Sequence, residues 1–207
     1  MTDSTIKSYD MGNRGTLTRE QVTFYYKEGY LVLPHLLDEN DMAGVIASME
    51  EHVDDIANDL FARSVIKDKR ENSPFESRLA ELFEGKEDAE FLRYGRGWRD
   101  RLPGYFDLMS KPIILDVVES LIGSEIFSNP VYNTRPKVPV VAAGEVPWHQ
   151  DKSYWPNADV NPVIAVWIAL VDATEDNGCL HILPRLHLNE VLSYHRESYS
   201  STRYTEI

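Results

Sequence analysis

The sequence predicts an α+β fold in which helices brace an antiparallel sheet. Helix caps and apolar residues at three- and four-residue steps occupy residues 16–123, whereas short β-rich runs broken by Pro, Gly and Asn fill residues 124–207. A length of 207 residues suits one domain with a substantial core. We therefore expect a single domain over residues 1–207, with residues 1–15 as a loose leader, mainly helical support next and the sheet last.

The first predicted helix follows the leader. Thr18 is a good N-cap, Gln21 completes a capping box with it, and Gly29 ends the helix. The next residues, YLVLPHLL, predict a short strand stopped by Pro34.

The sequence indicates two further helices. The next one along the chain is capped by Asp38, and a stripe of core residues recurs in it at three- and four-residue steps: Met42, Val45, Ile46, Met49, Val53, Ile56 and Leu60. The run KPIILDVVESLIG predicts the last helix, with Pro112 in its first turn and Gly123 at its end.

Residues 64–104 are charged and end in a Pro-Gly pair that predicts a turn. The favoured interpretation is an exposed excursion. The alternative is a lid whose arginines meet an acidic substrate: Arg93, Arg96, Arg99 and Arg101.

The strand-rich half contains the runs EIFSNPVYNTRPK, VPVVAAG, VIAVWIALVD and GCLHILP, with a hairpin signal at Asn177-Gly178. Alternation along VIAVWIALVD gives two faces. On one face, two alanines flank Trp167. Either the alanines leave space for a ligand beside the indole, as in a barrel interior, or the pattern reflects ordinary packing. The other face is bulky and is expected to pack on helices: Ile164, Val166, Ile168 and Leu170.

Composition excludes several classes of function. A net charge of −13 argues against binding nucleic acid, because no basic excess exists to displace counterions. The single cysteine rules out an intrachain disulfide framework and fits a reducing compartment. No long apolar run or secretory signal is present, so we expect a cytoplasmic protein that does not enter a membrane. Oligomeric state is left open.

The stretch VPWHQDKSYWP carries the candidate chemistry. On a strand, His149 and Asp151 point to one side while Gln150 faces away, so the pair can bind one ion. An imidazole nitrogen with a carboxylate oxygen suits Fe(II), Mn(II) or Zn(II), and a second histidine would complete a 2-His-1-carboxylate face with open positions for co-substrate and dioxygen. The alternative is a half-buried histidine with Asp151 as its charge partner.

Five segments in order resemble the phytanoyl-CoA dioxygenase family of Fe(II)/2-oxoglutarate-dependent oxygenases. They are LTREQVTFYYKEGYLVLPHLLDEND, PIILDVVESLIGSEI, YNTRPK, WHQD and DNGCLHILPRLH, and together they extend over roughly residues 17–187. The resemblance implies a double-stranded β-helix, the jelly-roll (cupin-like) barrel, with iron at one mouth. It also implies a small-molecule substrate and dioxygen as further reactants.

The resemblance assigns roles residue by residue. It implies His149 and Asp151 as metal ligands, and retention of this carboxylate implies hydroxylation and not halogenation. For 2-oxoglutarate it implies Asn133, Arg135 and Trp167. The substrate rim would hold Gln150, Lys152, Tyr154 and Trp155.

One part of the family pattern is not matched. The family has a second metal-binding histidine well downstream and, after it, an arginine for the distal carboxylate of 2-oxoglutarate. His187 matches a family histidine that does not bind metal, and His181 is expected to be structural. His195 is a poor substitute for the second metal-binding histidine, and Arg203 is a poor substitute for the arginine. The strand-rich half also offers about four or five of the eight strands of a jelly roll. We therefore expect a barrel that is incomplete at the C-terminus.

Three functions follow from these patterns. The leading one is an Fe(II)/2-oxoglutarate dioxygenase that hydroxylates a small organic molecule and releases succinate and CO2. The alternative is a catalytically inactive family member that binds a ligand or partner. A zinc hydrolase using the same pair is disfavoured, because no His-Glu-x-x-His helix supplies a general base.

Overall fold

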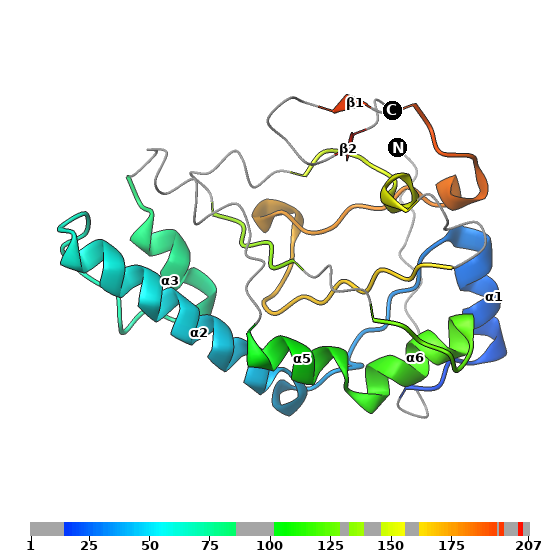
Figure 1. The fold of residues 1–207 in the computed structure, drawn as a ribbon, viewed down its shortest axis with the longest axis horizontal. Coiled ribbons are helices and arrows are strands. Elements are labelled where there is room, and N and C mark those ends of the chain that lie inside the picture. Colours follow the sequence, from blue (N-terminus) through cyan, green and yellow to red (C-terminus); the bar gives the residue numbers. More distant parts are fainter. Residues whose placement is uncertain are drawn as a thin grey trace.

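The helices of the protein lie along one side and the extended segments of its second half lie over them (Figure 1). This arrangement comes from a computed structural model. The structure describes in full residues 15–85, 102–128, 133–138, 146–155 and 162–193. For residues 195–196 and 203–204 it describes the backbone.

Helix α1 spans Arg19–Glu28 and begins and ends as the sequence predicts. The Gln21 amide donates to Thr18 Oγ1 at 3.2 Å and the Thr18 amide donates to Gln21 Oε1 at 2.6 Å, which closes the capping box. Gly29 then adopts φ 85°, a left-handed conformation that glycine reaches without strain.

Helix α2 spans Glu39–Ala62 and forms the core with its predicted stripe. Asp38 caps it through a second capping box, with Asp41 as the reciprocal partner. Leu60 is fully buried and Val45 is 1% exposed, and the other buried stripe residues are Met49, Val53 and Ile56. Met42 is partly buried against this core, whereas Ile46 is only half-buried, so the predicted stripe is confirmed as core except at Ile46.

Helix α3, Phe75–Leu82, corrects the interpretation of residues 64–104 as an exposed excursion. Leu82 is 3% exposed and Phe83 is fully buried, so this part of the segment contributes to the core. The charged residues around these positions concealed their helical spacing. The four arginines of the alternative lid interpretation lie outside the described residues.

Helix α5, Pro103–Met109, occupies the place where the sequence predicts only a turn. Pro103 takes a first-turn helix position, where its missing amide hydrogen costs nothing. Gly104 lies so close to α2 that a Cβ atom on it would be 2.3 Å from the carbonyl oxygen of Gly44. The glycine is needed for helix contact and does not mark a loop.

Helix α6, Pro112–Ile122, confirms the helix predicted between Lys111 and Gly123. Two contacts join it to the start of the chain: the Leu17 amide donates to Ser120 Oγ at 3.1 Å, and the Tyr26 hydroxyl donates to the carbonyl of Leu121. The predicted strand before Asp38 is wrong beyond one bridge residue at Val32.

The second half of the chain is extended and more exposed. Its two-faced run is confirmed in part, because Ile168 and Leu170 pack against the core while Trp167 is 51% exposed. Val166 departs from the prediction, being 54% exposed. At the predicted hairpin a 3-10 turn, η3 (Glu175–Asn177), leads into Gly178 at φ 82°.

The ladder hydrogen bonds of the described residues join β1, His195–Arg196, to β2, Arg203–Tyr204, in antiparallel register. His195 therefore lies in a short strand, although its surroundings show no strand pattern in the sequence. The jelly-roll barrel and the division of residues 1–207 into leader, support and barrel stay predictions.

Candidate metal centre

The motif WHQD lies where an extended segment turns into a 3-10 helix. Gln150 has extended dihedral angles, φ −107° and ψ 122°, and the helix η2 covers Asp151–Tyr154. Asp151 is thus the first residue of a tight turn and not part of a continuous strand, as the alternation argument assumes. The turn nevertheless brings the two predicted ligands together.

His149 and Asp151 lie in direct contact. Nε2 of His149 is 3.2 Å from Oδ1 of Asp151, and Nδ1 of the same ring is 2.8 Å from the carbonyl oxygen of Pro147. Because a carbonyl can only accept, Nδ1 carries the hydrogen and donates it to Pro147. A neutral His149 then presents a lone pair to a carboxylate oxygen, and a proton or cation is required between them.

The protonation of His149 reflects this arrangement. The hydrogen bond with Asp151 is the largest influence and raises the pKa of His149 above its ordinary value. Burial works against the charged imidazolium, and the hydrogen bond with Pro147 supports it. Arg135 lies near enough for its charge to lower the pKa in part. The pair therefore attracts a positive charge.

The geometry of the two donor atoms fits one metal ion. Metal–nitrogen and metal–oxygen bonds of about 2.1 Å at a right angle would separate the donors by about 3.0 Å, close to the observed 3.2 Å. Ligating histidines usually donate their second ring hydrogen to a carbonyl or carboxylate, as His149 does to Pro147. In the described ranges, no group of three or more His, Cys, Asp or Glu side chains could hold a metal ion.

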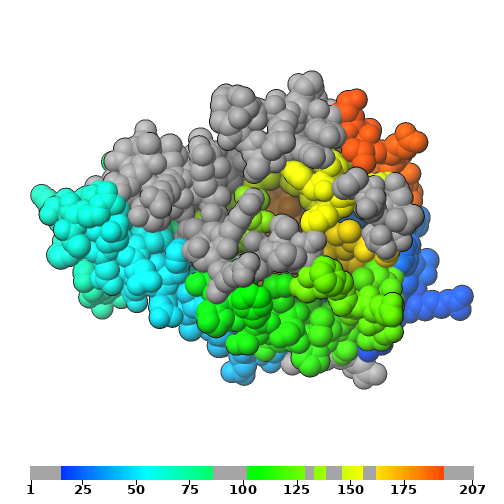
Figure 2. Space-filling model, in the orientation of Figure 1, coloured from blue at the N-terminus to red at the C-terminus, as the bar shows by residue number. Residues whose placement is uncertain are grey.

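The surroundings of the pair include some of the other predicted residues. The ring of Tyr154 meets the His149 ring edge-on at a centroid distance of 6.1 Å, and Arg135 acts on His149 through its charge. Trp155 follows η2 directly. The surface beside residues 146–155, yellow in Figure 2, is hollowed.

Gln150 points elsewhere, as alternation predicts. Its amide bonds two backbone groups of the segment 186–192 and not its neighbours in the motif. The proposed contacts of Asn133 and Trp167 with 2-oxoglutarate, and of Lys152 with substrate, stay predictions.

Two other histidines have structural contacts. Nε2 of His187 donates to the carbonyl of Tyr26 at 3.0 Å, and its ring lies against Gly29, where a Cβ atom would come within 2.2 Å of Nδ1. His181 meets the Trp148 ring edge-on at 6.3 Å and lies 3.7 Å from Cys179 Sγ.

Sequence reasoning missed the contact of Arg185 with Glu28. The Arg185 amide donates to the Glu28 carbonyl at 2.8 Å, and its guanidinium lies 3.0 Å from the Glu28 carboxylate. The partners are 157 residues apart, and no sequence pattern signals the contact.

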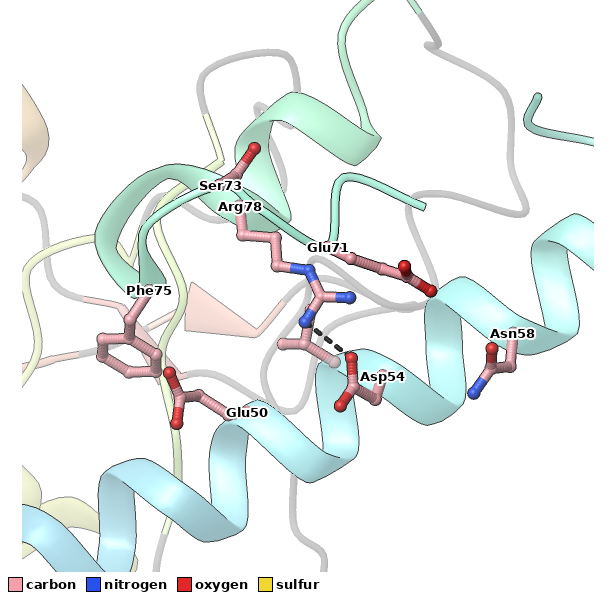
Figure 3. Close-up of a pocket in the computed structure, with 8 residues that line it drawn as sticks. Glu50, Asp54, Asn58, Glu71, Ser73, Phe75 and Arg78 are labelled. Carbon is pink, nitrogen blue, oxygen red and sulfur yellow. Dashed lines mark ion pairs between the residues drawn. The ribbon is translucent and has the colours of Figure 1, made fainter. Parts of the chain in front are cut away.

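A separate pocket of about 440 Å³ lies between α2 and α3 (Figure 3). Arg78 reaches across it to Asp54, with 2.6 Å between nitrogen and oxygen, and donates to the carbonyl of Lys69. Glu50 and Glu71 add negative charge to the lining. None of the lining residues belongs to the His149–Asp151 site, so this pocket is a feature of the helical half.

The histidine–carboxylate pair on the extended segment supplies two of the donor types that mononuclear non-haem metal sites use. The comparison with protein families makes this specific: the model of the phytanoyl-CoA dioxygenase (PhyH) family matches residues 25–206. The chain belongs to this family, which is one of Fe(II)/2-oxoglutarate oxygenases.

Individual relatives agree with the family match. The chain is 27% identical to the mouse and human proteins named peroxisomal phytanoyl-CoA dioxygenase, over 86% of its length and 50% of theirs. It is 30% identical to the phytanoyl-CoA dioxygenase of Arabidopsis thaliana over 86% of this chain and 68% of the relative. The chain thus spans about half the length of the mammalian relatives. No solved structure matches it significantly.

None of the helices in the described ranges is both long and apolar enough to cross a lipid bilayer.

Proposed function

We propose that the protein is an Fe(II)/2-oxoglutarate-dependent dioxygenase that hydroxylates a small organic molecule and releases succinate and CO2. Family membership supports the reaction class. The observation that carries the proposal is the 3.2 Å contact between His149 Nε2 and Asp151 Oδ1, with Nδ1 held by Pro147. That arrangement presents two metal donors on one side in the correct tautomer.

The roles of the chain's own residues follow from this site. His149 and Asp151 would hold Fe(II), which when bound supplies the site at which 2-oxoglutarate and dioxygen react. The carbonyl of Pro147 keeps the imidazole oriented and, in the neutral ring, holds the hydrogen on Nδ1, so that Nε2 has the lone pair for the metal. Asp151 contributes negative charge, which offsets part of the charge of the cation.

The remaining predicted residues complete the site in this proposal. Arg135 has the charge that a carboxylate of 2-oxoglutarate requires and already acts electrostatically on His149. Asn133 and Trp167 would contact the same co-substrate. Lys152, Tyr154 and Trp155, on or next to η2, would border the substrate. We propose a double-stranded β-helix as the fold that holds these segments together.

The metal assignment can be tested with the substitution Asp151→Ala. Loss of one ligand should abolish Fe(II) binding and leave the fold intact, because the Asp151 side chain is 58% exposed and its removal opens no core cavity. Asp107→Ala, at an exposed position in α5, is the matched control. Iron content is measured beside a thermal melt, and an unchanged iron stoichiometry in Asp151→Ala would reject the assignment.

The co-substrate assignment has an optical test. Adding 2-oxoglutarate with Fe(II) under anaerobic conditions should quench the fluorescence of Trp167, and Trp167→Phe should lose that part of the quenching. Succinate formation in air then separates the two functions that share the site. Iron uptake without succinate, whichever candidate substrate is supplied, would favour the non-catalytic ligand-binding alternative.

A further inference from the structure

The side chain of Gln150 fastens the metal motif to a distant part of the chain. Its Nε2 donates to the carbonyl of Leu186 at 3.3 Å, and its Oε1 accepts from the amide of Leu192 at 2.8 Å. One primary amide therefore bridges two backbone groups that are six residues apart. Both ends of the amide are used, so its orientation is fixed.

The segment that Gln150 holds is itself anchored to a helix. The turn η4, Leu186–Leu188, lies beside the end of α1 (Figure 1). Arg185 binds Glu28 through both its amide and its guanidinium, and His187 donates to the carbonyl of Tyr26. These contacts attach the segment to the last turn of α1, directly before its C-cap at Gly29.

We propose that Gln150 is a positioning residue that sets the geometry of the His149–Asp151 pair by fixing the backbone between them to the segment 186–192. This role rests on the proposed function, because it concerns Fe(II) held by that pair. Gln150 is the single residue between the two ligands, so a rotation of its backbone moves one donor relative to the other. Metal ligands must be held within about 0.5 Å of their working positions.

The same contacts explain how the pair forms outside a continuous strand. Pairing with a neighbouring strand could orient alternate residues, but Asp151 begins the turn η2. The two hydrogen bonds of the Gln150 side chain supply the fixed point instead. This role takes the place of the substrate contact predicted for Gln150, since a substrate would have to displace backbone groups from both ends of its amide.

The test compares Gln150→Met with Gln21→Met. Methionine nearly preserves the volume of glutamine and removes the amide. Gln21, the other glutamine of the chain, also bonds a backbone amide, that of Thr18, but it does so in the capping box of α1. Both substitutions should lower the melting temperature, and only Gln150→Met should weaken Fe(II) binding, by about 10- to 100-fold, as expected for a group that orients a metal ligand.

Two measurements on each purified chain decide the outcome. Anaerobic titration gives the Fe(II) affinity, and hydrogen exchange of the metal-free chain reports on the amide of Leu192, which should exchange at least tenfold faster in Gln150→Met. If Gln150→Met binds Fe(II) as tightly as the unchanged chain does, the role of Gln150 is overturned and the proposed function is not. The same holds if Gln21→Met loses as much Fe(II) affinity as Gln150→Met. No Fe(II) uptake by the unchanged chain would overturn the proposed function and this role with it.

Discussion

The two halves of the molecule are stabilised in different ways. Among the described residues, every buried apolar side chain except Val138 lies between Leu17 and Leu121. Most of the large apolar side chains that are exposed lie after Gly123, Trp167 and Leu188 among them. The helical half therefore has a conventional core, whereas the extended half depends on a few specific polar contacts.

This difference matters for function, because the candidate metal pair lies in the less buried half. Side chains on a packed helix are oriented by their neighbours. His149 is oriented instead by its bond to Pro147, and Gln150, as proposed, fixes the backbone between His149 and Asp151. Removing a contact in the helical half should thus affect stability, and removing one in the extended half should mainly affect the site.

The same substitution made in each half should give the largest contrast. Leu60→Ala in α2 removes a fully buried side chain and should cost about 2–5 kcal/mol of the free energy of unfolding. Leu188→Ala in the extended half removes one that is 65% exposed and should change stability by about 0.5 kcal/mol or less. Urea unfolding measures both. Similar losses would contradict the division into a core half and an exposed half.

Alanine substitutions at two glycines test how closely the helices of the helical half pack. Gly104→Ala would force the backbones of α5 and α2 apart and should destabilise by about 1–3 kcal/mol. Gly44→Ala places its methyl group in open space within α2 and should stabilise by about 0.5–1 kcal/mol. Thermal melts of the two variants should shift in opposite directions. A stabilising Gly104→Ala would show that the two helices are not in close contact.

Local signals explain how much of the helical half could be predicted. Thr18 and Asp38 begin helices because their side chains bond nearby amides, and the residues that make such contacts are close together in the sequence. The turn predicted at Pro103-Gly104 was wrong, and the reason is informative. A Pro-Gly pair usually marks a turn, but here the proline starts α5 and the glycine admits the backbone of α2, which only the tertiary contact reveals.

The candidate site was less predictable for a related reason. The pairing of His149 with Asp151 follows from their spacing, and the outward direction of Gln150 follows from alternation. The partners of Gln150 and Arg185 are remote in sequence, at separations of 36 to 157 residues, and involve mostly backbone groups. Backbone partners leave no residue type to recognise, so the sequence could not reveal them.

Arg185 offers a smaller test of how the extended half is held. It has φ 66°, a left-handed conformation that costs a residue with a side chain about 1 kcal/mol, while its half-exposed ion pair contributes about 0–1 kcal/mol. Arg185→Gly should therefore leave stability within about 1 kcal/mol. Arg185→Ala keeps the strain and loses the ion pair, so it should be the less stable variant in urea unfolding. The reverse order would mean that the left-handed conformation at position 185 carries no strain, because both variants lack the guanidinium.

The pH dependence of stability should show the smallest effect and separate the proton from the metal. Because contact with Asp151 raises the pKa of His149 in the folded chain, the imidazolium stabilises the metal-free fold fully below the unfolded pKa of about 6.5. This contribution is lost as pH rises through the raised pKa. Fe(II) requires the neutral imidazole, so stabilisation by Fe(II) should instead increase with pH over the same window.

Urea unfolding under anaerobic conditions between about pH 6 and 8 gives the slope of the free energy of unfolding against pH. It is measured once with Fe(II) and once without. In Asp151→Asn the carboxylate charge that favours the imidazolium is gone and the metal loses a ligand, so both slopes should flatten. Global charge effects would persist in that variant, because they do not depend on this pair. Slopes of the same sign with and without Fe(II) would mean that the proton and the metal do not compete for Nε2 of His149, and the 3.2 Å contact would then be only an ion pair.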